Sequence, residues 1–249
     1  MKRVLIPVGS LSHPPETKYP FTALRQKYVE KLREHCLQPL LVPSYTNEEE
    51  LEDYLSLCSG ILFTGGPDFD PKYYGQEKHA KTLAIDPGRD KIELLILKKI
   101  LDERREIPFL GICRGIQAAA IVGGGELYQH LPDITKEKHG EPEGSSYDHL
   151  SETPKHTVHL TPGSKIHAVF GRESIEMNTG HHQAVKNPGD FLVTGITEGG
   201  IIEVLEHPER GNFVAVQCHA ELQPDLNPLF SAFAEDVRSF SARYVNVFR

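Results

Sequence analysis

The sequence predicts an α/β fold in which helices cover both faces of a mostly parallel sheet. Short apolar runs, typical of buried strands, alternate with segments whose apolar residues recur at helical spacing. The connections between them are short, and parallel strands require such crossover helices. The ligand crevice of this kind of fold lies outside the carboxyl ends of the strands. Residues at the predicted strand ends are therefore the first candidates for a functional site.

The first half of the chain contains four strand–helix units. Residues 4–8 form a continuous apolar run, and residues 19–35 carry apolar side chains at helical spacing. Asn47, with Glu50 three residues later, forms the pattern of a capping box at the start of a helix over residues 47–58. The other elements expected in this half are strands at 39–42, 60–64 and 108–112, and helices at 89–102 and 114–121.

The second half has a different texture. Residues 126–164 are rich in Gly, Pro, Ser and His, which predicts loops that cover the crevice. Short strands are expected at 191–196, 200–206 and 213–217, and a helix at 227–244. These strands predict a small additional β-sheet region. Because no low-complexity linker divides the sequence, we expect one domain over residues 1–249.

Composition narrows the class of protein. The net charge of −8 provides no basic field for a nucleic acid. No apolar run reaches about eighteen residues, and no signal-like leader is present, so we expect neither a membrane span nor secretion. The four cysteines lack the spacing of a disulfide framework, which agrees with free thiols in the cytoplasm. A small molecule is the expected partner, and a homodimer is the default assembly.

One cysteine stands between glycines where a predicted strand meets a predicted helix, in P-F-L-G-I-C-R-G-I-Q at 108–117. Such a tight turn strains the residue at its tip, here Cys113, and Gly111 and Gly115 leave room for it. The start of the helix supplies N–H groups and positive partial charge, which favour the nucleophilic thiolate. A plainer interpretation is a buried cysteine that packs under a glycine-rich bend. The flanking pattern favours a nucleophile.

A base for this nucleophile is predicted at the end of the apolar strand 213–217. His219 follows that strand, and Glu221 comes two residues later. In an extended chain these two side chains lie on the same side, so the carboxylate of Glu221 would orient the ring and favour its protonated form. The sequence thus indicates a Cys113–His219–Glu221 triad. The alternative is that His219 only ends a strand.

Acyl transfer also needs donors for the developing oxyanion. The backbone N–H of Arg114, directly after the nucleophile, is one candidate. The second is the N–H of Gly66, from the pair Gly65–Gly66 at another predicted strand end. Glycine pairs are also common in turns without a catalytic role.

Several separated segments together resemble the class I glutamine amidotransferase-like superfamily. The similarity is closer to its γ-glutamyl hydrolase branch, of peptidase C26 type, which includes γ-glutamyl-γ-aminobutyrate hydrolase. The resemblance rests on residues 60–75, on L-G-I-C-R-G-I-Q with 123–131, on M-N-T-G-H-H-Q at 177–183 and on 206–221. It implies a flavodoxin-like three-layer sandwich and hydrolysis of a γ-glutamyl amide through a thioester on Cys113, with His219 and Glu221 completing the triad.

Substrate contacts are also expected. A γ-glutamyl group carries an α-ammonium and an α-carboxylate, and Gln117, one helical turn beyond Cys113, is placed to reach them. The resemblance implies that His181, His182 and Gln183 line the same crevice. Without it, such a trio is equally typical of a surface loop or of a metal site.

No metal or cofactor is expected, because zinc calls for more ligands at regular spacing. Asp68 and Asp70 are interpreted as turn-forming residues rather than Mg²⁺ ligands.

One departure from the family pattern affects the base motif. The family has W-H-P-E where this chain has Cys218, His219, Ala220 and Glu221. Without proline, the backbone between His219 and Glu221 is expected to be freer, which affects substrate shape or rate more than reaction type. Cys218 is expected to face the opposite side and to pack.

The sequence leaves three functions open. The leading hypothesis is a stand-alone γ-glutamyl hydrolase. The second is a glutaminase subunit that passes ammonia to a separate synthetase. The third, suggested by the altered base motif, is a non-catalytic binding protein on the same fold.

Overall fold

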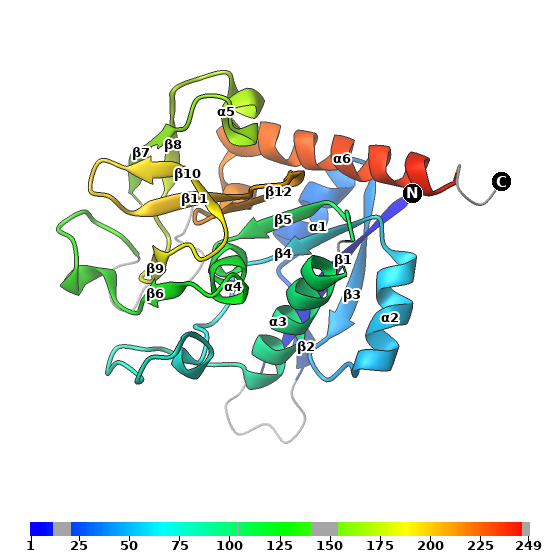
Figure 1. The fold of residues 1–249 in the computed structure, drawn as a ribbon, viewed down its shortest axis with the longest axis horizontal. Helices are drawn as coiled ribbons and strands as arrows, with labels where there is room; N and C mark the ends of the chain where they lie inside the picture. The colour runs from blue at the N-terminus through cyan, green and yellow to red at the C-terminus, as the bar shows by residue number, and fades with distance from the viewer. Residues whose placement is uncertain (12–20, 104, 141–153, 246–249) are drawn as a thin grey trace.

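The computed structural model describes residues 1–11, 21–103, 105–140 and 154–245. Its centre is a parallel sheet (Figure 1). Five strands run parallel in the order β3, β1, β4, β5 and β12. Crossover helices connect β1, β3, β4 and β5, whereas β12 follows the antiparallel strand β11. Their bounds are Leu37–Pro43, Lys2–Leu11, Gly60–Phe63, Phe109–Ile112 and Arg210–Val216.

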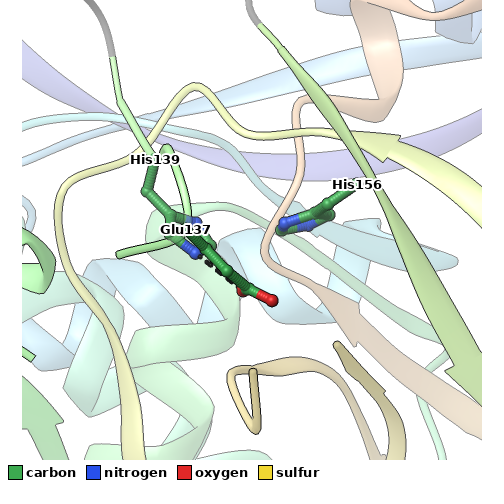
Figure 2. Close-up of side chains that lie close together, drawn as sticks. All are labelled: Glu137, His139 and His156. Atoms are coloured by element: carbon green, nitrogen blue, oxygen red, sulfur yellow. Dashed lines mark hydrogen bonds and ion pairs between the residues drawn. The ribbon is translucent and has the colours of Figure 1, made fainter. Parts of the chain in front are cut away.

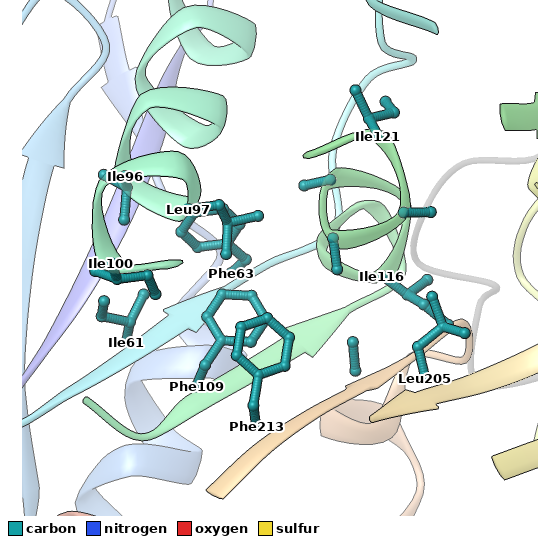
Figure 3. Close-up of a cluster of buried hydrophobic side chains, with 14 of the residues drawn as sticks. Ile61, Phe63, Ile96, Leu97, Ile100, Phe109, Ile116, Ile121, Leu205 and Phe213 are labelled. Atoms are coloured by element: carbon teal, nitrogen blue, oxygen red, sulfur yellow. The ribbon is translucent and has the colours of Figure 1, made fainter. Parts of the chain in front are cut away.

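The helices form two layers on this sheet. One apolar cluster joins it to α2 (Glu48–Leu57), α3 (Pro87–Asp102) and α4 (Arg114–Val122). Figure 3 shows this cluster, in which Leu97 of α3 and Ile116 of α4 lie over Phe109 and Phe213 of the sheet. A second cluster joins the other face to α1 (Gln26–Glu34) and α6 (Asn227–Val245). The three-layer α/β sandwich expected from the sequence is therefore present.

The additional strands continue the central sheet. Beyond β12 it extends antiparallel through β11 (Ile202–His207), β10 (Leu192–Thr197), β7 (Lys155–Leu160) and β8 (Ser174–Asn178). The short strands β6 (Glu126–Tyr128) and β9 (Ala184–Asn187) pair with each other, and β9 also pairs with β11. The helix α5 (Lys165–Phe170) follows β7. In Figure 1 β7, β8, β10 and β11 lie on the side of the molecule away from α2.

Two sequence expectations about these elements are wrong. The segment 126–164 is not all loop, because β6 and β7 lie in it; residues 141–153 are outside the described part. The helix expected at 19–35 begins only at Gln26, and Phe21–Ala23 instead forms β2, antiparallel to β1. Phe21 is exposed, whereas Tyr28 and Leu32 are buried, so only the later apolar positions form the helix's packing face.

The capping box predicted at α2 is present. The Asn47 side chain accepts from the backbone N–H of Glu50, and the Glu50 carboxylate accepts from the N–H of Asn47. Among the described helices, none is both long and apolar enough to cross a membrane.

Candidate active site

Cys113 lies at a strained turn between β5 and α4. Its backbone has φ 52° and ψ −98°, a region that residues with a side chain rarely occupy. Its N–H donates to the carbonyl of Val216 at 2.8 Å, which ties the turn to β12. A Cβ on Gly111 would lie 2.9 Å from that of Ala215, so glycine is required for the close approach. The fold therefore holds the thiol, 8% exposed, at the carboxyl end of β5.

His219 follows β12, the neighbour of β5, and carries a carboxylate on its ring. Its Nδ1 donates to Oε1 of Glu221 at 2.7 Å, and both side chains are buried. Burial lowers the pKa of His219, but the charge of Glu221, and the charge and hydrogen bond of Cys113, raise it to about 10. The ring is therefore held as an imidazolium next to the sulfur of Cys113.

The contact between His219 and Glu221 forms by a different route from the one predicted. The chain is not extended here, because Ala220–Leu222 is a short 3₁₀ helix that starts after His219. The turn brings the carboxylate of Glu221 back to the ring, where an extended strand was expected to present both side chains on one side. Cys218 is buried in the apolar cluster that also contains α1 and α6, as the expected packing role requires.

Asn178 holds the backbone of the base and was not singled out from the sequence. Its Oδ1 accepts from the N–H of His219 at 2.8 Å, and its Nδ2 donates to the carbonyl of the same residue at 2.9 Å. Its own N–H donates to Oε1 of Gln223 at 3.0 Å. These bonds fix the turn where the family has proline and this chain has Ala220. Asn178 belongs to the segment M-N-T-G-H-H-Q, in which the sequence analysis assigned roles only to His181, His182 and Gln183.

The glycine loop after β4 is oriented by an arginine. Nη2 of Arg89 donates to the carbonyls of Thr64 and Gly65, each at 3.0 Å. The N–H of Gly65 donates to the hydroxyl of Tyr28 at 3.0 Å. Because a trans peptide points its C=O and the next N–H in opposite directions, the N–H of Gly66 faces away from Arg89. The candidate donor Gly66 is thereby directed to the side of the loop opposite Arg89.

The N–H of Arg114 is the second backbone donor expected from the sequence. It opens α4, where the first N–H groups have no partner within the helix. A Cβ on Gly65 would lie 2.5 Å from Cε1 of His219, so the glycine loop also touches the ring of the base. The two candidate donors thus come from the two segments that contact Cys113 and His219.

A buried ionic network supports this loop. The Arg114 guanidinium binds Asp90 and Glu93 of α3, and its Nε donates to the carbonyl of Pro67 at 3.0 Å. Nε of Arg89 donates to Glu93 at 2.7 Å. Two cations and two carboxylates balance one another, as such burial requires. The spacing of Arg89, Asp90 and Glu93 on one predicted helix could have indicated this network, but the sequence analysis did not predict it.

The expected substrate residues point in different directions. Nε2 of Gln117 lies 3.4 Å from Oε1 of Gln217, whose amide donates to the sulfur of Cys113 at 3.7 Å. Nε2 of His182 bonds Asp68 at 2.9 Å, and so ties its loop to the glycine loop. Gln183 is buried, and its amide donates to a backbone carbonyl, that of Gln129, at 3.2 Å.

His181 was expected on the same crevice wall, but its side chain is only 1% exposed and lies against Glu203. It belongs to a second cluster of polar side chains.

A cleft of about 550 Å³ opens beside the glycine loop, with Tyr28, Gly65, Gly66 and Arg89 in its wall. It borders the candidate donor Gly66, whereas Cys113, Arg114 and His219 are not among the residues that line it. The acidic residues of the loop serve as expected: Asp68 accepts from the N–H of Leu83, and Asp70 caps a 3₁₀ turn.

The fold and the cysteine turn are those of the class I glutamine amidotransferase-like superfamily. Residues 8–221 match the Peptidase C26 family model, and the chain belongs to that family. It is 34% identical to "Putative glutamine amidotransferase-like protein YvdE" of Lactococcus lactis over 79% of this chain and 80% of the relative. It is 28% identical to the γ-glutamyl-γ-aminobutyrate hydrolase PuuD of Escherichia coli over 80% and 78% of the two chains.

A longer relative matches as well. "Putative glutamine amidotransferase Rv2859c" of Mycobacterium tuberculosis is 36% identical over 82% of this chain, and the match spans only 64% of that protein. Among solved structures, a glutamine amidotransferase from Thermotoga maritima superposes with a TM-score of 0.56 at 18% identity, over 96% of this chain and 84% of that one. That likeness shows the fold.

Proposed function

We propose that this protein hydrolyses the amide bond of γ-glutamyl compounds, releasing glutamate and an amine. The observation that supports this proposal is the position of His219, whose ring lies between the Glu221 carboxylate and the sulfur of Cys113. A thiolate–imidazolium pair at a strained turn is the arrangement that acyl transfer to sulfur needs. The Peptidase C26 match and the similarity to PuuD support the γ-glutamyl class.

The proposed reaction has two halves. The Cys113 thiolate attacks the γ-carbonyl carbon, and the oxyanion accepts hydrogen bonds from the N–H groups of Gly66 and Arg114. The imidazolium of His219 gives its proton to the leaving amine as the C–N bond breaks. A water molecule, deprotonated by the now neutral ring, attacks the thioester, and glutamate leaves as the thiolate returns. Glu221 keeps its hydrogen bond to the ring throughout.

We assign recognition of the γ-glutamyl group to the glutamine side chains near the sulfur of Cys113, which form one wall of the candidate substrate site. Gln117 and Gln217 supply amide groups there, and the Gln183 side chain is buried nearby. Amide groups can accept from an ammonium and donate to a carboxylate, so this wall suits the two charged ends of the glutamyl moiety.

A panel of γ-glutamyl amides assayed for glutamate release tests the proposal. We expect turnover of at least one member and none by Cys113→Ala, while the variant keeps its circular-dichroism spectrum. An electrophilic glutamine analogue should label Cys113 in preference to Cys36, the exposed thiol on the surface. Cys36→Ala is the matched control and should leave labelling and turnover unchanged. Equal turnover by Cys113→Ala would refute the mechanism.

A second candidate function is favoured by the names of several relatives. Two relatives are named as putative glutamine amidotransferases or proteins like them. By analogy, this chain would be a glutaminase that passes ammonia to a synthetase partner. Strong preference for glutamine over other γ-glutamyl amides, together with activity that depends on a co-purifying protein, would support this candidate over a stand-alone hydrolase.

A further inference from the structure

A second group of polar side chains converges next to the candidate active site. His139 lies after β6, His156 on β7, His181 after β8 and Glu203 on β11. The ring centroid of His139 lies 5.1 Å from that of His156 and 5.0 Å from that of His181. Figure 2 shows His139 and His156 reaching the same place from separate segments, with Glu137 bonded to His139. Four segments far apart in the sequence thus meet at one point.

Two of the spacings between nitrogen and oxygen atoms in this cluster match those in a metal's coordination shell. Oε1 of Glu203 lies 3.4 Å from Nε2 of His156 and 3.4 Å from Nε2 of His181. Tetrahedral zinc with bonds of about 2.0–2.1 Å places neighbouring ligand atoms about 3.4 Å apart. Ligand atoms of His139, His181 and Glu203 all lie within 4.8 Å of one another. His139 also forms a group of this kind with Glu137 and His156, so His139 joins the two sets of side chains.

The same atoms lack the hydrogen bonds that burial demands. In the described part of the chain, Nε2 of His156, Nε2 of His181 and both carboxylate oxygens of Glu203 have no hydrogen-bond partner. The side chains of His181 and Glu203 are 1% and 0% exposed, and that of His156 is 13% exposed. Buried polar groups without partners are costly, so their convergence points to a missing ligand.

The hydrogen bond on the far side of His181 fixes which nitrogen faces the cluster. Its Nδ1 lies 3.0 Å from the carbonyl oxygen of Gln183, which can only accept, so Nδ1 carries the proton. Nε2 therefore faces the Glu203 carboxylate at 3.4 Å. A cation between the two groups would be bound by both. A backbone carbonyl behind a ligating histidine is the support that metal-binding rings have.

We propose that His139, His156, His181 and Glu203 bind one divalent transition-metal ion, with zinc as the first choice. Three imidazoles with one carboxylate suit Zn²⁺ and its neighbours, whereas Mg²⁺ and Ca²⁺ take oxygen ligands. Four protein ligands close the shell, which is typical of a structural site. Glu137, whose Oε2 lies 3.3 Å from Nε2 of His139, supports that ring.

The proposed site differs from the sequence expectation of no metal, which rested on too few ligands at regular spacing. The ligands come from four segments that only the sheet brings together. The ion would link the segment around His139 and strand β7 to strand β11. One of its ligands, His181, contacts the backbone carbonyl of Gln183. The ion would therefore hold the wall of the candidate substrate site without touching the reacting atoms.

Metal stoichiometry tests the proposal on the full chain without an affinity tag. After chelator treatment and dialysis against Zn²⁺, mass spectrometry of the metal should find one ion per chain in the wild type. His156→Asn and Glu203→Gln should each weaken Zn²⁺ binding by about tenfold or more. His159→Asn, on the same strand but 52% exposed, is the matched control and should retain the ion. A wild type that retains no zinc, or equal affinity in all three variants, would overturn the proposal.

A cobalt spectrum separates this site from the candidate nucleophile and needs no ligand variant to fold. Co²⁺ bound by imidazoles and a carboxylate should show tetrahedral d–d bands without a thiolate charge-transfer band. Cys113→Ser should leave that spectrum unchanged. A thiolate band that disappears in Cys113→Ser would place the metal on the sulfur instead and refute the assignment.

Discussion

The carbonyl oxygen of Gly65 accepts a hydrogen bond from Nη2 of Arg89 at 3.0 Å, and this bond sets the direction of the next peptide N–H. Because the peptide is planar and trans, Gly66 must then point its N–H the opposite way. Arg89 is itself held by Glu93, which also binds Arg114. The candidate oxyanion site is thus preorganised by a network on the far side of the loop.

Arg89→Lys tests this positioning role. Lysine has no planar fork, so the loop carbonyls lose their fixed donors and the Gly66 N–H loses its alignment. We expect kcat to fall by up to about 10²-fold, near the effect of losing one oxyanion donor, with KM little changed. Arg33→Lys, on the exposed face of α1, is the control and should behave like the wild type. An unchanged kcat in Arg89→Lys would contradict the role.

Glu221→Gln tests the electrostatics of the base. Burial lowers the pKa of His219, but Glu221 and Cys113 together raise it to about 10, so removal of the Glu221 charge lowers that pKa and narrows the pH range in which the ring is protonated. Because the leaving amine needs that proton, the alkaline limb of kcat/KM should move from near pH 10 to lower pH. A pH–rate profile measures the shift. An alkaline limb in the same place would show that Glu221 does not act on His219.

Asn178→Ala tests the clamp on the base. The variant removes both hydrogen bonds that the Asn178 side chain makes to the buried backbone of His219, at a cost of about 1–3 kcal/mol in the free energy of unfolding. Since the turn carries the ring, kcat should fall while KM changes less. Urea unfolding and steady-state kinetics give the two numbers. A loss of stability with wild-type kcat would make Asn178 a purely structural residue.

Gly65→Ala tests the contact between the glycine loop and the base. The new Cβ would lie 2.5 Å from Cε1 of His219, so the ring or the loop must move. We expect a loss of kcat of about 10²-fold or more, as for misplaced reacting groups. Gly211→Ala adds its methyl group where no heavy atom lies within 4 Å and should leave kcat unchanged. Equal kcat in the two variants would refute the contact.

Local patterns predicted much of the molecule. The capping box of Asn47 and Glu50, the apolar run of β1 and the helical period of α3 depend on neighbouring residues alone, and all three elements form. The glycine-flanked turn of Cys113 is equally local, because the steric crowding at a strand-to-helix junction depends on only a few adjacent residues. The failures came where a distant strand competed, as when Phe21 paired with β1 instead of joining α1.

By itself, then, the sequence determined the α/β alternation, the strained cysteine and the histidine–glutamate pair that follows an apolar strand. Only the tertiary structure decided what these residues meet, because contacts between distant segments depend on strand order and not on periodicity. The parallel pairing of β5 with β12 brings Cys113 towards His219. The antiparallel extension, likewise, places Glu203 against His156 and His181, a convergence that no spacing along the chain announces.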